Sequence, residues 1–554
     1  MTFNLLTGPF FPVRTRSGAR RWVSFADLAK REGDEAPVAF AWPRSDFNAA
    51  CFELAIGVAA LALDLARPED WHDEWCEPDG PEALADKIAP FVHAFAFLGE
   101  GPCFLQDLAP LPGDPNPVEA LLIDTPGANG QKKNADLLTH GGRYPQLGLP
   151  AAAMALYTLQ QFAPSGGAGN RTSMRGGGPM TCLVLPGAHQ DGTPACLWDI
   201  VLANLPLVTD GVPRQKLERV FPWLAPTLTS GKDTGGQVIH ENDPRVHPLQ
   251  AFFGMPRRLR LVAGETEGTC AMTGETGPVV TGFVQVPYGV NYGLWSHPLT
   301  PYRRLKPEGE PYPAKPKSAH MGYRDWVSVT YGDPVSKTAD PAQNVQHLLK
   351  RSAELRQKPC TRADPRLRIA GWAMSNMEAI AFLDSEQPLY LAEDEGAAKA
   401  LAGFALQMAG AADFAAGLLR NALRRALFSE NASVDTAKGL FHAARASFYA
   451  ETESAFHQHL GHLNEDGGHR GEALRRWLHK MHDVAERLFD DATADVEANG
   501  DAMRRIADAA SLMRAAFFGY GKDGKALFTL LDIAAPATAK TAKTGAGKAK
   551  GRSL

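Results

Sequence analysis

The sequence predicts an α+β fold, with a large irregular mixed α/β region followed by a C-terminal four-helix bundle. Two observations lead to this prediction. Residues 200–370 are rich in proline and glycine and hold short β-like runs, whereas residues after about 388 are rich in alanine and leucine with helical periodicity. With 554 residues the chain is long enough for several domains. We expect a mixed α/β domain at 1–387, a helical bundle at 388–535 and a disordered basic tail at 536–554.

The N-terminal region begins with a predicted β-hairpin. The stretch GPFFPVRTRSGARRWVSF is typical of two strands that turn near Ser17 and Gly18. A long apolar helix is expected from about Asp46 to Leu65. Further on we expect a loop at 125–146, a helix at AAAMALYTLQQF and, after a glycine-rich stretch, a strand at MTCLVLPG.

The C-terminal region shows four helical stretches, near 393–430, 434–461, 470–498 and 500–518. Short breaks separate them, and each is amphipathic, which is typical of a helical bundle. The last stretch, PATAKTAKTGAGKAKGRSL, is basic and nearly free of bulky apolar residues. Such a composition cannot bury a core, so we expect it to be disordered.

Composition and charge limit the classes of function. The formal net charge is −5, so any nucleic-acid binding must depend on local basic patches. The seven cysteines show no C-x-x-C spacing, which fits a cytoplasmic protein without a disulfide framework. The longest apolar run is interrupted by Glu53 and Asp64, so we expect no membrane span.

The stretch SGGAGNRTSMRGGGP, residues 165–179, is the first candidate site. Six of its fifteen residues are glycine, and it carries Arg171 and Arg175 but no acid. Glycines allow sharp turns and close approach of the backbone, and bare N–H groups with arginines suit an anion. A P-loop would need a lysine after Gly169, a strand before it and a helix after it, and the sequence offers none of these. The remaining alternatives are a loop without a ligand and a contact to a nucleic-acid backbone.

A basic run precedes a second candidate site. Between residues 344 and 369, seven cations face two acids, a density that could neutralise several phosphates; they are Lys350, Arg351, Arg356, Lys358, Arg362, Arg366 and Arg368. The alternative is a solvated helix face followed by a polar loop. Next come Trp372, Met374 and Met377 around Asn376, and a side chain on a turn there could insert into a duplex. Alternatively, the tryptophan and methionines belong to a core.

Motifs for metal or covalent chemistry are absent or weak. Glu453 and His457 are four residues apart, but nothing repeats this pair on another helix, so a solvated face explains them better. Cys270 stands alone in GTCAMTGETG, so we expect no zinc site. No nucleophile or metalloprotease motif is present, and we expect no cofactor and no enzyme activity.

Several segments, in a fairly specific order, resemble one protein family over nearly the whole chain. They are NLLTGPFFPVR, DTPGANGQKKNADLL, APSGGAGNRTSMRGGGPMT, TGFVQVPYGVNYGLWSHPLTP and GWAMSNMEA, followed by the terminal bundle. This chain is similar to the large subunit of the type I-E CRISPR Cascade complex, an RNA-guided antiviral surveillance assembly. The resemblance implies a non-catalytic subunit that recognises the protospacer-adjacent motif of duplex DNA, mainly from the minor groove. It also implies that the subunit wedges the duplex open for guide RNA and helps recruit a helicase–nuclease.

The resemblance assigns roles to particular residues of this chain. The glycine loop of the family falls on Gly167, Ala168 and Gly169, and the wedge falls on Asn376 with Ser375 and Met377 beside it. A lysine that reads the motif in some relatives falls near Gln285, which carries no charge. The loop that meets the 5′ handle of the CRISPR RNA and the incoming DNA carries Lys132, Lys133 and Asn134. The rival interpretations are a docking scaffold without duplex contact and a nucleotide-binding enzyme.

Overall fold

A computed structural model describes residues 3–127, 139–167, 169–333, 336–355, 364–392, 394–428, 438–466, 469–496 and 499–535. The chain divides into two compact units, Met1–Lys399 and Ala400–Leu554. The tail expected at 536–554 lies outside the described residues. The expected domain limits near 387 and 535 stay predictions.

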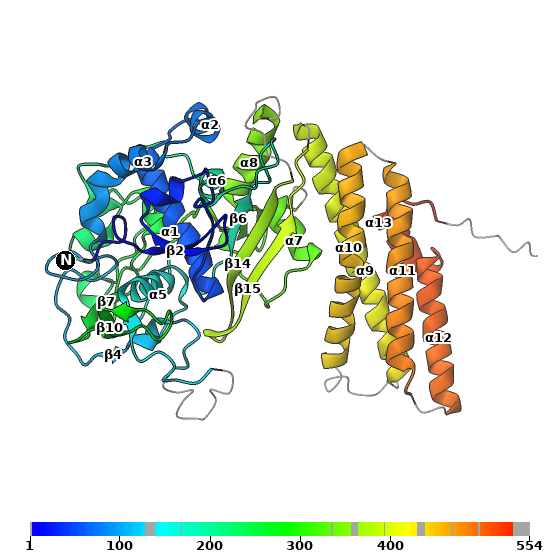
Figure 1. The fold of residues 1–554 in the computed structure, drawn as a ribbon. Coiled ribbons are helices and arrows are strands. Elements are labelled where there is room, and N and C mark those ends of the chain that lie inside the picture. Colours follow the sequence, from blue (N-terminus) through cyan, green and yellow to red (C-terminus); the bar gives the residue numbers. More distant parts are fainter. Residues whose placement is uncertain are drawn as a thin grey trace, which may run out of the picture. The chain divides into compact units, whose positions relative to one another are not determined.

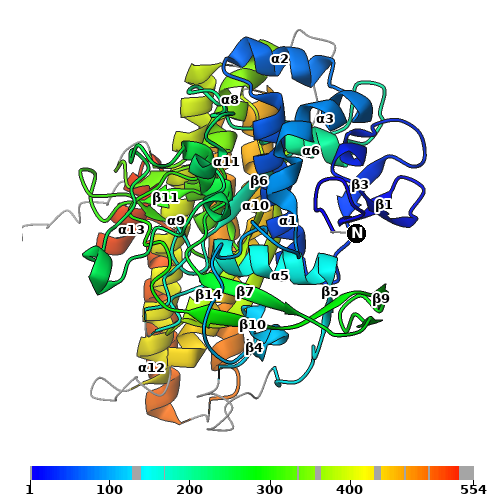
Figure 2. The ribbon, with the colours of Figure 1, turned by 90° about the vertical axis from the view of Figure 1, so that its left-hand side faces the viewer.

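A long buried helix, α1 (Ser45–Leu63), forms the centre of the first unit. Nearly all its side chains are apolar, and nearly all are buried, because the helix is covered on every side. Both views place α5 (Leu149–Phe162) next to it (Figures 1 and 2). At Gly57 of α1, a Cβ atom would lie only 2.6 Å from Cβ of Phe252, so glycine permits the close packing seen there. The other helices are α2 (Pro68–Cys76), α3 (Pro81–Ile88), α6 (Leu197–Ala203), α7 (Tyr323–Thr330) and α8 (Gln343–Leu355).

The strands of the first unit form small antiparallel sheets. In the described residues their orders are β2-β1-β3, β4-β10-β5 with β7 on β10, β12-β11-β13, β15-β14-β6 and β8-β9. Local antiparallel pairing next to helices, without a large parallel sheet, is the predicted α+β class. The strands are β1 (Phe11–Thr15), β2 (Arg20–Val23), β3 (Pro37–Phe40), β4 (Asn116–Pro117), β5 (Leu147–Gly148), β6 (Thr181–Leu185), β7 (Arg258–Ala263), β8 (Gly268–Thr269), β9 (Thr276–Gly277), β10 (Val279–Val286), β11 (Tyr302–Arg303), β12 (Tyr312–Pro313), β13 (Ala339–Asp340), β14 (Arg366–Ser375) and β15 (Glu378–Pro388).

The second unit is helical, as predicted. Four long helices match the four expected stretches: α9 (Glu395–Leu427), α10 (Lys438–Asp466), α11 (Arg470–Thr493) and α12 (Gly500–Phe517). A short helix, α13 (Gly521–Leu530), follows α12 and was not predicted. Trp477 of α11 is fully buried, and its indole N–H donates to the backbone oxygen of Met408 in α9 at 3.0 Å. The helices lie side by side in Figure 1 and share an apolar core that includes Phe448, Phe456 and Leu460.

Two helices have the length and mean hydropathy of a membrane span. They are Ser45–Leu63 and Gly396–Leu427. Of the most apolar window in each helix, 94% is buried inside the protein in the first and 61% in the second. Core helices of soluble proteins meet the same criteria, so this observation is weak evidence for a membrane.

Candidate nucleic-acid interface

The glycine-rich stretch 165–179 connects the end of α5 to the start of β6. Gly167 and Gly169 have φ values of +69° and +85°, a left-handed conformation that favours glycine. A Cβ atom at Gly169 would lie 2.8 Å from the ring of Tyr288, whereas the space next to Gly167 is open. The backbone is therefore bare at Gly167 and tightly packed at Gly169. Ala168 lies outside the described residues.

Strand β10 and the residues after it hold the glycine stretch from one side. Nε2 of Gln285 donates to Oδ1 of Asn170 at 2.8 Å, and the N–H of Tyr288 donates to the backbone oxygen of Gly169 at 3.0 Å. The structure thus brings Gln285 to the glycine stretch, although 115 positions separate Gln285 from Asn170. The hydrogen bond also fixes the orientation of the Gln285 amide.

Tyr288 is a candidate site residue that the sequence reasoning missed. It has a φ of +63° and is 41% exposed, which is an unusual combination for a large aromatic residue. Arg171 lies over its ring with 5.9 Å between the guanidinium carbon and the ring centroid. Backbone strain of this kind is often kept at functional sites. The run Pro287-Tyr288-Gly289 directly after a β-like stretch was the available signal in the sequence.

The two arginines of the glycine stretch have different environments. Arg171 is half-buried and donates through Nε to Oγ of Ser230 at 2.8 Å and through Nη2 to the backbone oxygen of Ser230 at 3.0 Å. Arg175 is only 1% exposed and forms a buried ion pair with Glu53 of α1, with 2.7 Å between Nη2 and Oε2. The structure corrects the contact to a nucleic-acid backbone expected of Arg175, because its guanidinium is enclosed by protein. Its position indicates that it anchors the glycine stretch to α1.

Arg175→Met is expected to lower the free energy of unfolding of the chain by about 3–5 kcal/mol, because it leaves the Glu53 carboxylate buried without its counter-ion. The double variant Arg175→Met with Glu53→Met removes both charges and should lose less stability. Urea unfolding of the three proteins measures both effects. Equal stability of the wild type and Arg175→Met would contradict the anchoring role.

The residues expected to act as a wedge lie at the tip of a long β-hairpin formed by β14 and β15. Asn376 and Met377 form its two-residue turn, with φ values of +47° and +68°, as in the type I′ turns of tight hairpins. Ser375 and Asn376 are exposed, and Met377 is 59% exposed. The turn was predicted, but the ten- and eleven-residue strands that carry it were not. An exposed apolar side chain at the tip of a hairpin is suited to insertion between base pairs.

The hairpin is tied to the far end of the glycine stretch. Strand β14 pairs with β6, with Ala370 opposite Thr181. Gly178, with a φ of +63°, lies so close to the hairpin that a Cβ atom would overlap the backbone oxygen of Trp372. The glycine stretch therefore lies between Gln285 at one end and the hairpin at the other. Three of the predicted site elements are thus neighbours in the fold.

The basic run before the hairpin contributes less free charge than its composition suggests. Lys350 of α8 is exposed, as expected. Arg351 is only 6% exposed and packs on Trp71 with 4.5 Å between the guanidinium carbon and the ring centroid, so the structure corrects its expected phosphate contact. Arg366 and Arg368 form ion pairs with Glu386 and Asp384 across the hairpin. Arg356 and Lys358 lie outside the described residues.

The loop expected to meet the guide RNA is described only at its two ends. Lys132, Lys133 and Asn134 lie outside the described residues. Glu119 contacts both ends of this loop. Its backbone oxygen accepts from Oγ1 of Thr125 at 2.7 Å, and its carboxylate accepts from the N–H of Gly142 at 2.7 Å.

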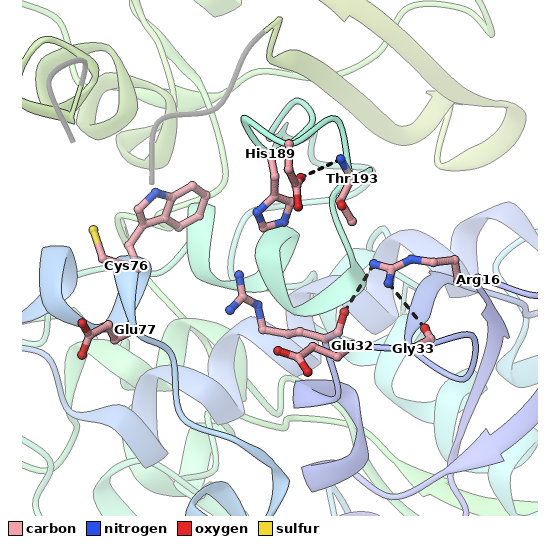
Figure 3. Close-up of a pocket in the computed structure, with 10 residues that line it drawn as sticks. Arg16, Glu32, Gly33, Cys76, Glu77, His189 and Thr193 are labelled. Atoms are coloured by element: carbon pink, nitrogen blue, oxygen red, sulfur yellow. Dashed lines mark hydrogen bonds between the residues drawn. The ribbon is translucent and has the colours of Figure 1, made fainter. Parts of the chain in front are cut away.

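A hollow of about 600 Å³ lies between the loop after β1, the end of α2 and residues 189–193 (Figure 3). Its volume would admit a nucleotide, but its basic side chains, Arg16, Arg31 and His189, already contact acceptors of the protein. Arg31 and His189 both contact Asp199, and Arg16 donates to the backbone oxygen of Gly33 at 3.4 Å. The carboxylates of Glu32, Glu77 and Asp191 also line it and would repel phosphates. None of the predicted site residues lines this hollow.

Metal-binding residues do not gather in the described part of the chain, where no group of three or more His, Cys, Asp or Glu side chains could hold an ion. Cys270 is a buried free thiol in the turn between β8 and β9. Burial lowers the pKa of His457 to about 4, which keeps its imidazole neutral near pH 7.

Comparisons with known proteins agree with this architecture. Residues 4–488 match the family model described as CRISPR-associated protein Cse1. A CRISPR-associated protein from Thermus thermophilus is 17% identical with a TM-score of 0.69, and the match covers 96% of this chain and 100% of that one. Cse1 from Thermobifida fusca is 18% identical with a TM-score of 0.67, covering 96% and 98%. A chain of a structure described as a CRISPR RNA-guided surveillance complex is 15% identical with a TM-score of 0.68, covering 93% and 99%. Because the family model matches most of its length, this chain belongs to the Cse1 family of CRISPR-associated proteins.

Proposed function

We propose that this chain is a non-catalytic subunit of an RNA-guided surveillance complex that recognises a short motif in duplex DNA and wedges the duplex open. One observation supports the proposal most strongly: the glycine stretch contacts both Gln285 and strand β14, which carries the exposed hairpin tip, through a hydrogen bond on one side and close packing on the other. Membership of the Cse1 family and the similarity to a chain of a CRISPR RNA-guided surveillance complex support its place among Cascade subunits.

Each element has a distinct task in this proposal. The bare backbone at Gly167 approaches the floor of the minor groove, where a side chain would prevent contact. The amide of Gln285, oriented by Asn170, offers a donor and an acceptor to base edges. Met377 and Asn376 then insert between base pairs and separate them, so that guide RNA can pair with one strand.

Further partners follow from the same proposal. Lys132, Lys133 and Asn134 contact the 5′ handle of the CRISPR RNA, and Lys350 contacts a DNA phosphate. Other Cascade subunits surround the chain, and the recruited helicase–nuclease docks partly on it. The complex acts in the cytoplasm, where its DNA targets are.

The test compares the DNA affinity of the reconstituted guide complex with and without this chain. The targets are duplexes that match the guide and carry randomised flanking motifs. We expect the chain to confer flank-dependent binding with a relaxed preference, because the minor groove distinguishes A·T from T·A poorly. Selection of a single invariant trinucleotide would contradict readout from the minor groove. Equal affinity with and without the chain would favour a docking scaffold instead.

A further inference from the structure

Arg257 lies beneath the start of the glycine stretch, and neither the motifs nor the basic runs of the sequence pointed to it. It directly precedes β7 and is only 6% exposed. Gln160 of α5 fixes its backbone, because Oε1 of Gln160 accepts from the Arg257 N–H at 3.0 Å and Nε2 donates to the Arg257 oxygen at 3.0 Å. Its side chain donates through Nη2 to the backbone oxygen of Pro164. The guanidinium is therefore held in one place.

The positive charge of Arg257 has no counter-ion in the described part of the chain. Its Nε is buried without a hydrogen-bond partner, and the side chain forms no ion pair with a carboxylate. The next residue differs, since Arg258 pairs with Asp107 at 2.6 Å. Burial lowers the pKa of the Arg257 guanidinium to about 10, with no neighbouring anion to oppose the shift. A buried charge without a partner is costly and is therefore often a site for a bound ion of opposite charge.

The guanidinium points toward the bare backbone of the glycine stretch. A Cβ atom at Gly166, which is exposed, would lie 2.9 Å from Nη1 of Arg257, whereas the equally buried guanidinium of Arg351 is covered by Trp71. Gly166 and Gly167 are exposed, and among the described residues no acceptor bonds to the N–H of either one. Consecutive free N–H groups next to a fixed cation form a binding site for an anion. The ring of Tyr288, packed on Gly169, borders the same stretch.

We propose that Arg257, together with the N–H groups of Gly166 and Gly167, binds one backbone phosphate of the target DNA. This inference rests on the proposed function and adds a single phosphate position to it. Contacts to phosphate carry no sequence information but fix the register of a protein on the duplex. The bound phosphate would thus place Gln285 opposite a defined base pair.

The test couples a change in the protein to a change in the DNA. The guide complex is reconstituted with the wild-type chain or with Arg257→Met. Each is titrated with duplexes that carry one neutral methylphosphonate at successive positions of the flank. We expect Arg257→Met to weaken binding of unmodified DNA about tenfold or more, the usual loss for a charged hydrogen bond. At one methylphosphonate position the wild type should lose the same factor, and Arg257→Met should lose nothing further.

A matched control is Arg219→Met. Arg219 also donates to a backbone oxygen, that of Val246 at 2.9 Å, and likewise has a buried Nε without a partner, but it does not bond to the glycine stretch. At every position, a methylphosphonate should lower the DNA affinity of the Arg219→Met complex by the same factor as that of the wild type. If Arg257→Met fails to fold, Gly166→Ala serves instead, because the Cβ of the alanine would collide with Nη1 of Arg257 and displace the guanidinium. With the DNA that carries the methylphosphonate at that one position, Gly166→Ala should bind as tightly as the wild type.

The outcomes separate this inference from the proposed function. Suppose that binding depends on the flank, but that every methylphosphonate weakens DNA binding by the Arg257→Met or Gly166→Ala complex as much as it weakens binding by the wild type. This result would overturn the phosphate site and leave motif recognition intact. Absence of flank-dependent binding by the wild-type complex would overturn both.

Discussion

Replacing Gly167 and Gly169 together with aspartate is expected to abolish motif-dependent DNA binding. Both positions have positive φ, where a side chain costs about 1–2 kcal/mol each. A Cβ at position 169 also collides with Tyr288, and two carboxylates would face the phosphates of the duplex. The measurement is the affinity of the guide complex for matched and unmatched flanks. We expect the ratio to fall below about twofold, or roughly 0.4 kcal/mol.

A control for this variant changes two glycines of similar conformation elsewhere in the first unit. Gly192 and Gly211 have φ values of +83° and +66° and open space around them. Their replacement with aspartate adds the same charge and similar strain without touching the candidate interface. This control should keep the flank preference. Full motif-dependent binding by the Gly167 and Gly169 variant would contradict the groove contact.

Removing the side chains of the hairpin tip is expected to impair strand opening more than the first contact with DNA. Asn376→Gly with Met377→Gly is the sharpest variant, because glycine keeps the positive φ of both turn residues. Without an inserted side chain nothing offsets the cost of unstacking a base step. Permanganate reactivity of the displaced strand should fall at least about tenfold, which corresponds to roughly 1.4 kcal/mol less stabilisation of the opened state.

Two comparisons complete this experiment. Asn376→Ala with Met377→Ala deletes the same groups but strains the turn. A difference in strand opening between the double-alanine and double-glycine variants is therefore due to the conformation of the turn and not to the loss of the inserted side chains. Leu305→Ala removes a side chain that is 89% exposed and lies outside the hairpin, and it should leave opening unchanged. Unchanged permanganate reactivity in both tip variants would remove the wedge role.

The helices were the most predictable part of the fold. The mostly apolar sequence of α1 and the amphipathic repeats of the second unit follow from burial, on all sides of α1 and on one face of the bundle helices. The short α13 was missed because ten residues that contain two glycines carry little helical signal. The β14–β15 hairpin was missed because its turn, Asn376-Met377, lacks the Asn-Gly or Asp-Gly pair that normally signals such a turn.

The candidate interface was predictable in its parts but not in its pairings. Clusters of glycine and arginine are visible in a sequence, and they led to the glycine stretch and the basic run. The partners of those arginines are distant in the chain: Arg175 meets Glu53 across 122 positions, and Arg351 lies on Trp71. A local count of charges therefore overestimated the cations available to DNA. Arg257 escaped notice for the opposite reason, because its importance comes from the absence of a counter-ion among the described residues.

The anchoring of the glycine stretch has a consequence for how it would select DNA. From Gly169 to Gly178 its conformation is fixed by Tyr288, Gln285, Glu53 and the hairpin before any ligand arrives, so little chain entropy is lost there on contact. A stiff backbone does not adapt to the width of a groove. We expect it to discriminate by shape, so that stiff A-tracts with a narrow minor groove in the flank are rejected even where every base offers suitable acceptors.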